Sequence, residues 1–197
     1  MAAPAGPSSR KAAAHVVTRN KSESAGDFAV RYAPKGGELV GKVVETAAFG
    51  AKHAVIAFYK LDFKAKSDYT EVHGYLFMPQ AGDEYEKILI NKFEAEGATP
   101  EIETVFFANA DKDAARELVV ICSWRQDHYD VSGKLFATYI FDDVAGVKAP
   151  ERLKYLKKIS ENVSGGCDCN YRDHSKADKR FETAAQVKTG LMKLGYK

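Results

Sequence analysis

The residues best suited to bind a metal ion lie in one short polar segment between two apolar runs. The segment NADKDAARE covers residues 109–117 and separates EIETVFFA from LVVICSW. Oxygen ligands at every second position allow a small loop to surround a hard cation, and the ninth position closes the shell. The spacing therefore predicts a calcium site whose side-chain ligands are Asn109, Asp111, Asp113 and Glu117.

Residues 105–121 resemble the calcium hairpin of FG-GAP and related integrin-type repeats. That hairpin has the pattern Asp/Asn-x-Asp-x-Asp-Gly-x-x-Asp followed by an apolar strand, and the resemblance implies calcium as the cofactor. Ala114 replaces the glycine of the pattern, Glu117 replaces its last aspartate, and the chain has one copy of a motif that occurs in series. A polar Asx turn between two strands, which Asn and Asp favour for local reasons, is the alternative interpretation.

The three cysteines allow several kinds of chemistry. Cys122 lies in the apolar run VVICSW and is predicted to be a small buried residue. Cys167 and Cys169, with His174 nearby, offer thiolate and imidazole ligands for zinc, although a fourth ligand is missing. The alternatives are an exposed redox pair, or a Gly-rich loop in which one cysteine is structural or bridges to Cys122 in an exported protein.

A second polar cluster follows an apolar run and has the composition of a protein interface. Trp124, Arg125, His128 and Tyr129 lie together in WRQDHYD. Large aromatic side chains and arginine contribute most of the binding energy at many interfaces, so these four residues are the candidate contacts for a protein partner. The same composition also occurs at the rim of ordinary β-domains.

The sequence contains no nucleophile elbow, Walker loop, dinucleotide-binding glycine pattern or His-Glu-x-x-His motif, which favours a protein without enzymatic activity. A net charge of +2 argues against a dedicated nucleic-acid binder, and no apolar run is long enough to span a membrane. We therefore expect a non-enzymatic binding protein, such as a bacterial exported inhibitor or immunity-type protein. The alternatives are a calcium or zinc module, a metal-dependent enzyme, or an accessory subunit of a larger assembly.

The elements that would position these residues are mostly strands. Apolar runs rich in Val, Ile, Phe, Tyr and Thr suit a pleated, half-buried surface, and Gly, Pro, Ser and Asp separate them. The runs cover residues 28–33, 39–49, 53–63, 70–78, 86–96, 101–109, 117–124 and 134–142. Because no helix-length segment lies between them, we expect about eight antiparallel strands arranged as a sandwich or a meander.

The pattern changes near Pro150, and two C-terminal helices are predicted. The first covers residues 150–166, with Leu153, Leu156, Ile159 and Val163 on one face. The second begins near Ser175 and ends at Gly195. The whole pattern predicts an α+β domain over 28–197, β-rich over 28–147 and helical over 148–197.

Residues 1–27 are rich in Ala, Pro and Ser and lack a hydrophobic period, which predicts a flexible tail. The small residues at its start slightly favour a periplasmic or secreted protein over a cytoplasmic one. Acidic side chains outnumber basic ones over 28–147, and basic side chains outnumber acidic ones over 148–197. The two parts are therefore expected to attract each other, or to steer a charged partner.

Overall fold

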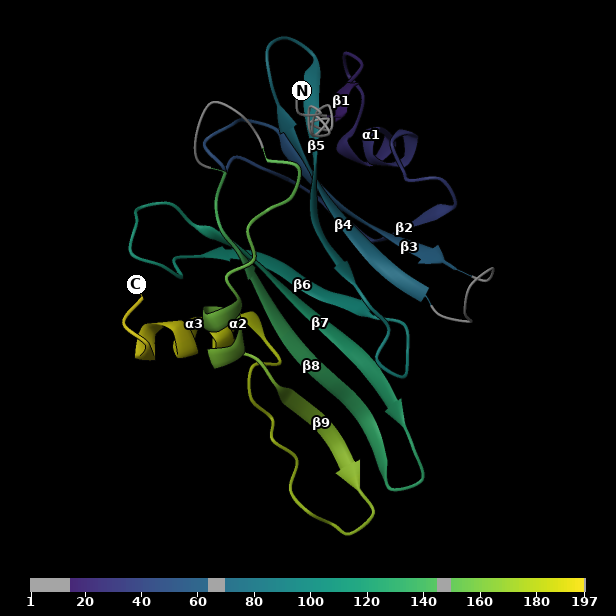
Figure 1. Ribbon diagram of the computed structural model, residues 1–197, viewed down its shortest axis with the longest axis vertical. Coiled ribbons are helices and arrows are strands. Elements are labelled where there is room, and N and C mark those ends of the chain that lie inside the picture. Colours follow the sequence, from purple (N-terminus) through teal and green to yellow (C-terminus); the bar gives the residue numbers. More distant parts are fainter. Residues whose placement is uncertain (1–14, 64–69, 145–149, 197) are drawn as a thin grey trace, which may run out of the picture.

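The computed structural model describes residues 15–63, 70–144 and 150–196, and within them it has two antiparallel sheets and three short helices (Figure 1). The sheets have strand orders β1-β5-β4-β3-β2 and β6-β7-β8-β9. The strands are β1 (His15–Thr18), β2 (Gly37–Thr46), β3 (Ala54–Asp62), β4 (Thr70–Pro79), β5 (Glu84–Phe93), β6 (Glu101–Ala108), β7 (Glu117–Asp127), β8 (Val131–Phe141) and β9 (Gly166–Tyr171), and the helices are α1 (Ala25–Arg31), α2 (Lys157–Asn162) and α3 (Ala184–Lys193). The predicted α+β fold, mostly antiparallel, is confirmed.

The two sheets pack face to face, and alternate residues of their strands fill the space between them. In β3, Ile56 and Phe58 belong to this central core, whereas Val55 and Tyr59 belong to a second cluster on the outer face with Phe28 of α1. β3 is thus buried on both faces, which explains why its sequence is almost continuously apolar.

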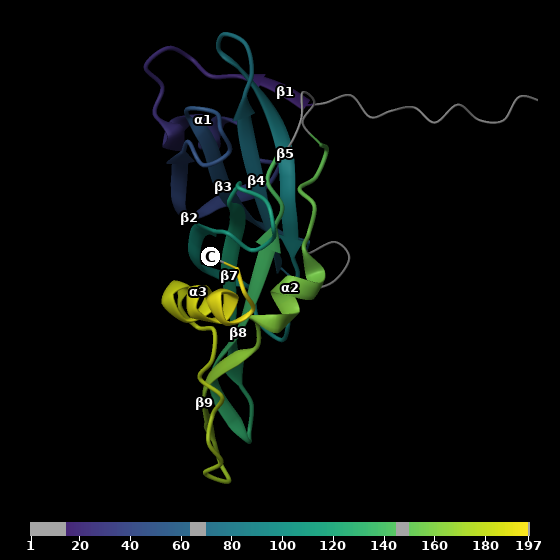
Figure 2. The same cartoon turned by 90° about the vertical axis from the view of Figure 1, so that its left-hand side faces the viewer.

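β7 has the same double burial in the other sheet. Val120 and Cys122 enter the central core, whereas Val119 and Ile121 pack on the outer face with Leu191 of α3. α2 and α3 lie beside each other on this sheet, as both views show (Figures 1 and 2). The order of layers is therefore α1, first sheet, second sheet, then α2 with α3.

One irregular segment, residues 151–156, joins the two sheets by backbone hydrogen bonds, and we call it the bridging segment. On one side the amide of Leu89 in β5 donates to the carbonyl of Glu151, and the amide of Leu153 donates to the carbonyl of Leu89. On the other side the amide of Asp142 donates to the carbonyl of Lys154, and the amide of Leu156 donates to the carbonyl of Ile140 in β8. The end of β8 is thereby held against β5.

The bridging segment also corrects the first predicted C-terminal helix, because only Lys157–Asn162 is helical. Leu153 packs in the central core, while Leu156, Ile159 and Val163 pack on the outer face of the second sheet. The four apolar residues that were predicted to share one helical face therefore pack into two different clusters.

The second predicted helix begins later than expected. α3 starts after Thr183, whose side chain accepts from the amide of Gln186 in a capping box. Residues 175–182 are not helical, although Gly195 does follow the helix end with a φ of 93°. The segment between α2 and α3, expected to be a loop, contains β9. No helix in the described part of the chain is long and apolar enough to cross a membrane.

The N-terminal region differs from the prediction in two ways. Residues 28–33 were expected to form a strand, but Phe28 lies in α1, whose N-cap Ser24 accepts from the amide of Asp27. Residues 15–18 were expected to belong to a flexible tail, but they form β1 and pair with β5. Residues 25–27 of the predicted tail begin α1, and residues 1–14 of that tail lie outside the described residues.

Candidate metal centre

The loop between β6 and β7 contains the predicted calcium ligands and is folded by its own side chains. Asp111 Oδ1 accepts from the amide of Asp113 at 2.8 Å, and Asp113 Oδ1 accepts from the amide of Ala115 at 2.8 Å. Asn109 Nδ2 donates to the carbonyl of Asp113 at 3.2 Å. The two aspartate contacts are Asx turns, so the alternative interpretation of the sequence describes this part of the backbone correctly. They use one oxygen of each aspartate and leave the other available.

Glu117 is the unusual residue of the site. It is the first residue of β7 and is fully buried. Its Oε2 accepts from the amide of Ala110, but its buried Oε1 has no hydrogen-bond partner among the described residues. Burial raises the pKa of this carboxyl, and the nearby charges of Asp111 and Asp113 raise it further. A buried carboxylate oxygen without a partner is costly unless a proton or a cation satisfies it.

Asp142, which follows β8, completes a cluster with two of the predicted ligands. One carboxylate oxygen from each of Asp111, Glu117 and Asp142 lies within 4.8 Å of the other two. The cluster thus joins the β6–β7 loop, the start of β7 and the end of β8. Asp143 lies beside it, and burial together with Asp113, Asp142 and Asp111 raises the pKa of the Asp143 carboxyl.

Asn109 adds an amide oxygen to the same loop. Its Oδ1 is buried and has no hydrogen-bond partner among the described residues. Asn109 and Glu117 therefore each present an unpaired buried oxygen, and both belong to the predicted ligand set. Oxygen-only donors of this kind suit calcium, which takes six to eight oxygen ligands in flexible geometry.

Lys154 of the bridging segment contacts the cluster through Asp142. Its Nζ lies 2.7 Å from Asp142 Oδ2, and its side chain is 75% exposed. The amide of Asp142 also donates to the Lys154 carbonyl, so the two residues are linked twice. An ammonium group on a flexible exposed side chain balances part of the negative charge and can be displaced at small cost.

The structure places the four predicted calcium ligands in different positions. Asp111 and Glu117 lie in one cluster, and Asn109 has an unpaired buried oxygen. Asp113 is not part of the three-carboxylate cluster and serves the loop backbone. Asp142 was missed, because only the sheet pairing of β7 with β8, in which Leu118 faces Phe141, brings it to the loop.

The predicted zinc ligands are arranged differently from the expectation. Cys167 and Cys169 lie in β9 and form a disulfide with each other, so neither sulfur is a thiolate ligand in this state. The alternative of a bridge to Cys122 is wrong, because Cys122 is a free thiol, buried in the central core as its apolar run predicts. His174 is exposed and belongs to no metal-type cluster among the described residues.

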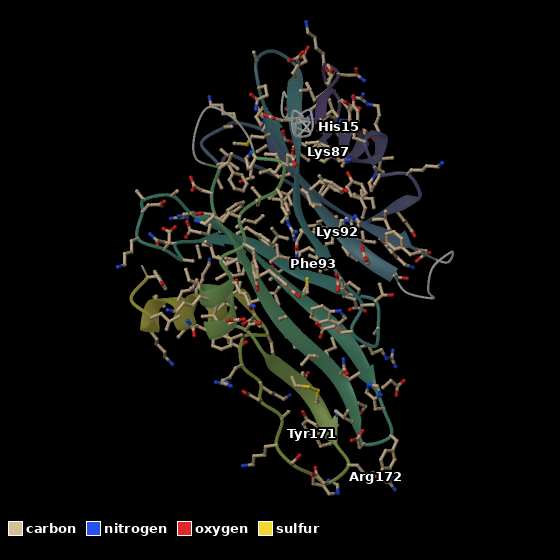
Figure 3. All side chains as sticks on the ribbon, viewed as in Figure 1. His15, Lys87, Lys92, Phe93, Tyr171 and Arg172 are labelled. Atoms are coloured by element: carbon tan, nitrogen blue, oxygen red, sulfur yellow. A yellow bond between two sulfur atoms is a disulfide. The ribbon has the colours of Figure 1, made fainter. Side chains whose placement is uncertain are left out.

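The predicted partner contacts separate into one core residue and three exposed ones. Trp124 is buried in the central core, and its Nε1 donates to the carbonyl of Glu94 at 3.0 Å, so it is not available to a partner. Arg125, His128 and Tyr129 are exposed around the β7–β8 hairpin, and Tyr129 is 83% exposed. Arg172, which Figure 3 labels at the lower tip of the molecule, lies with its guanidinium over the Tyr129 ring, 5.1 Å from the ring centroid.

Comparison of the chain with protein-family models, with curated proteins and with solved structures finds no match. The resemblance of residues 105–121 to an FG-GAP calcium hairpin therefore stays a hypothesis that rests on the residues of the loop.

Proposed function

We propose that this chain is a non-enzymatic binding protein that holds a divalent cation, calcium, between the β6–β7 loop and the end of β8. The observation that carries the proposal is the fully buried carboxylate of Glu117, whose Oε1 has no partner among the described residues. This oxygen belongs to a group that lies with Asp111 and Asp142 in one cluster. A cation at that place satisfies all three carboxylates at once.

The donor set favours calcium over softer metals. The carboxylates of Asp111, Glu117 and Asp142 and the amide oxygen of Asn109 are hard ligands, and the three-carboxylate cluster contains neither histidine nor cysteine. The residues come from separate segments of the second sheet. The bound ion thus fastens the β6–β7 hairpin to β8 and would fix the loop as part of a recognition surface.

Calorimetric titration of the purified chain with calcium tests this function. We expect one bound calcium per chain, and we expect Glu117→Gln and Asp142→Asn to abolish the binding heat. Asp127→Asn is the matched control, because Asp127 is also a carboxylate residue but is 77% exposed at the β7–β8 hairpin. If wild type gives no heat, and its melting curves in calcium and in chelator superimpose, the cation-binding proposal is wrong.

A protein partner is the second candidate function, and Tyr129 is the observation that favours it. A large aromatic ring that is 83% exposed, with Arg172 against it, has the chemistry of an interface anchor. A photoreactive phenylalanine analogue at position 129 should crosslink a defined partner in the native source. The same analogue at Met192, which is 60% exposed on α3, is the control for unspecific capture. Equal crosslinking at both positions contradicts a specific interface at the hairpin.

A further inference from the structure

The disulfide between Cys167 and Cys169 lies within a single strand at the edge of the second sheet. Figure 3 shows its sulfur–sulfur bond on β9, in the lower part of the molecule. β9 is last in the strand order, and among the described strands only β8 pairs with it. On its other side, the amide of Cys167 donates to the carbonyl of Asp178 at 2.7 Å.

This disulfide does not join distant parts of the chain. Its two cysteines are separated by two positions in sequence, and the stabilisation expected from a cross-link grows with the length of the loop that it closes. The ladder to β8 already positions both residues, because Cys167 faces Leu135 and Cys169 faces Gly133. Stabilising the fold is therefore a poor explanation for the bond.

The neighbouring strand, β8, has a backbone that accommodates β9 with its disulfide formed. The Cα atoms of Cys167 and Cys169 are 5.1 Å apart, whereas two residues of an extended strand span about 6.6 Å. β9 is thus contracted at Asp168, and a Cβ atom on Gly133 would collide with the Asp168 carbonyl oxygen. Gly133 has a φ of 144°, which a side chain would disfavour. A glycine at this place lets β8 accept the contracted strand.

The two bonded cysteines differ in burial from each other and from the third cysteine. Cys167 is half-buried, while Cys169 is 6% exposed. Cys122 is fully buried in the central core, and burial raises the pKa of its thiol, so it does not take part. An incoming thiolate therefore reaches the Cys167 sulfur first, with Cys169 as the leaving group.

We propose that Cys167 and Cys169 form a reversible thiol–disulfide exchange site whose substrates are dithiols. A substrate thiolate attacks Cys167 Sγ, a new sulfur–sulfur bond forms, and the bond to Cys169 breaks with release of its thiolate. The second thiol of the substrate then attacks its own sulfur in the mixed disulfide and releases the Cys167 thiolate. The substrate is oxidised to a disulfide, the cysteine pair is reduced by two electrons, and the two substrate protons end on the cysteines. This site is independent of the proposed cation site.

The first experiment measures exchange in the folded protein. The full chain is incubated with reduced dithiothreitol at neutral pH, with and without denaturing urea, then quenched with acid and alkylated for mass analysis. We expect Cys167 and Cys169 to become reduced together in the folded chain, while Cys122 stays unlabelled until urea is added. If the disulfide of the folded chain is reduced at a rate within about a hundredfold of the rate in urea, the result supports the exchange site. Slower reduction overturns the proposal, because the disulfide then reacts only after the chain unfolds.

The second experiment separates exchange from a merely structural disulfide. Catalytic amounts of the chain are added to a reduced dithiol peptide with oxidised glutathione as the terminal oxidant. We expect at least about a tenfold acceleration of peptide oxidation by wild type and by Cys122→Ser. Neither Cys167→Ser nor Cys169→Ser should accelerate it. No acceleration by wild type, or equal acceleration by Cys167→Ser, overturns the proposal.

Discussion

Two glutamates are buried in the described part of the chain, one in each sheet, and their surroundings differ. Glu71 of β4 has its Oε2 2.5 Å from Nε2 of His73, two positions along the same strand. Glu117 of β7 is fully buried, and its Oε1 has no partner among the described residues. The first sheet thus supplies its buried carboxylate with a neighbour of its own, while the second leaves an oxygen unsatisfied.

This difference indicates which buried carboxylate belongs to a ligand site. A buried acid that is satisfied within the fold is part of the structure, and removing its partner is destabilising. A buried acid that has an unpaired oxygen and lies among other carboxylates costs stability until a cation binds. The comparison predicts opposite consequences for the same substitution, glutamate to glutamine, at the two positions.

The largest expected effect is the calcium-dependent stability of wild type. At a free calcium concentration about 100 times the Kd, the free energy of unfolding should rise by about 2.7 kcal/mol, because the ion binds the folded chain alone. Glu117→Gln should abolish this increment and should not be less stable than wild type in chelator, since it removes the unpaired buried charge. Urea denaturation with calcium and with chelator measures both. A retained increment in Glu117→Gln would show that the ion binds elsewhere.

Glu71→Gln should give the opposite result. The free energy of unfolding should fall by about 2 kcal/mol, because the buried contact between the Glu71 carboxyl group and the His73 ring is lost. The calcium increment should be unchanged. The same urea experiments measure both quantities, and His73→Gln with the double variant supplies a cycle for the coupling between the two side chains. Additive effects in that cycle would contradict a paired Glu71.

Lys154→Met should tighten calcium binding. The ammonium group contacts Asp142 at 2.7 Å and competes with the ion for that carboxylate. Because the lysine side chain is exposed, the gain should be modest, up to about fivefold in Kd by calorimetry. Lys157→Met is the matched control, since Lys157 is equally exposed and contacts Glu161 instead. A weaker Kd in Lys154→Met would mean that the lysine assists the site.

The smallest effect concerns pH in the absence of calcium. The pKa of Glu117 in the folded chain lies above its ordinary value of 4.5, so the folded state binds this proton more tightly than the unfolded state. Its contribution to stability therefore falls as pH rises from about 4.5 through the raised pKa. The difference in unfolding free energy between wild type and Glu117→Gln isolates this contribution. As pH rises across that interval, the unfolding free energy of wild type should fall relative to that of Glu117→Gln. The calcium affinity of wild type should increase over the same interval. A difference that does not change with pH would contradict a raised pKa.

Much of the β-structure was predictable because local pattern and tertiary role agree. The runs at 53–63 and 117–124 are apolar on both faces and become the doubly buried β3 and β7. The run at 28–33 has the same composition but forms a helix, because Ser24 caps it and Phe28 packs on the first sheet. Composition over so few residues does not separate a strand from a short helix.

The candidate metal centre was only partly predictable for a similar reason. The ligand spacing in 109–117 is a local property, and it identified Asp111 and Glu117. Asp142 comes from the end of β8 and has no local signal, since its position depends on strand register. Trp124 had the right chemistry for an interface, but the packing of the two sheets buries it.

The bridging segment has a consequence for the order in which the chain folds. All the strands that it fastens precede it in sequence, so during synthesis both sheets can form hairpins before residues 151–156 leave the ribosome. Until then β5 is bonded along one edge to β4, and β1 covers only its first residues on the other. The backbone of Leu89 is therefore exposed to pairing with foreign strands in the nascent chain. The closing of this edge by Glu151 and Leu153 is expected to be a late event, after which the protein no longer offers that edge to another molecule.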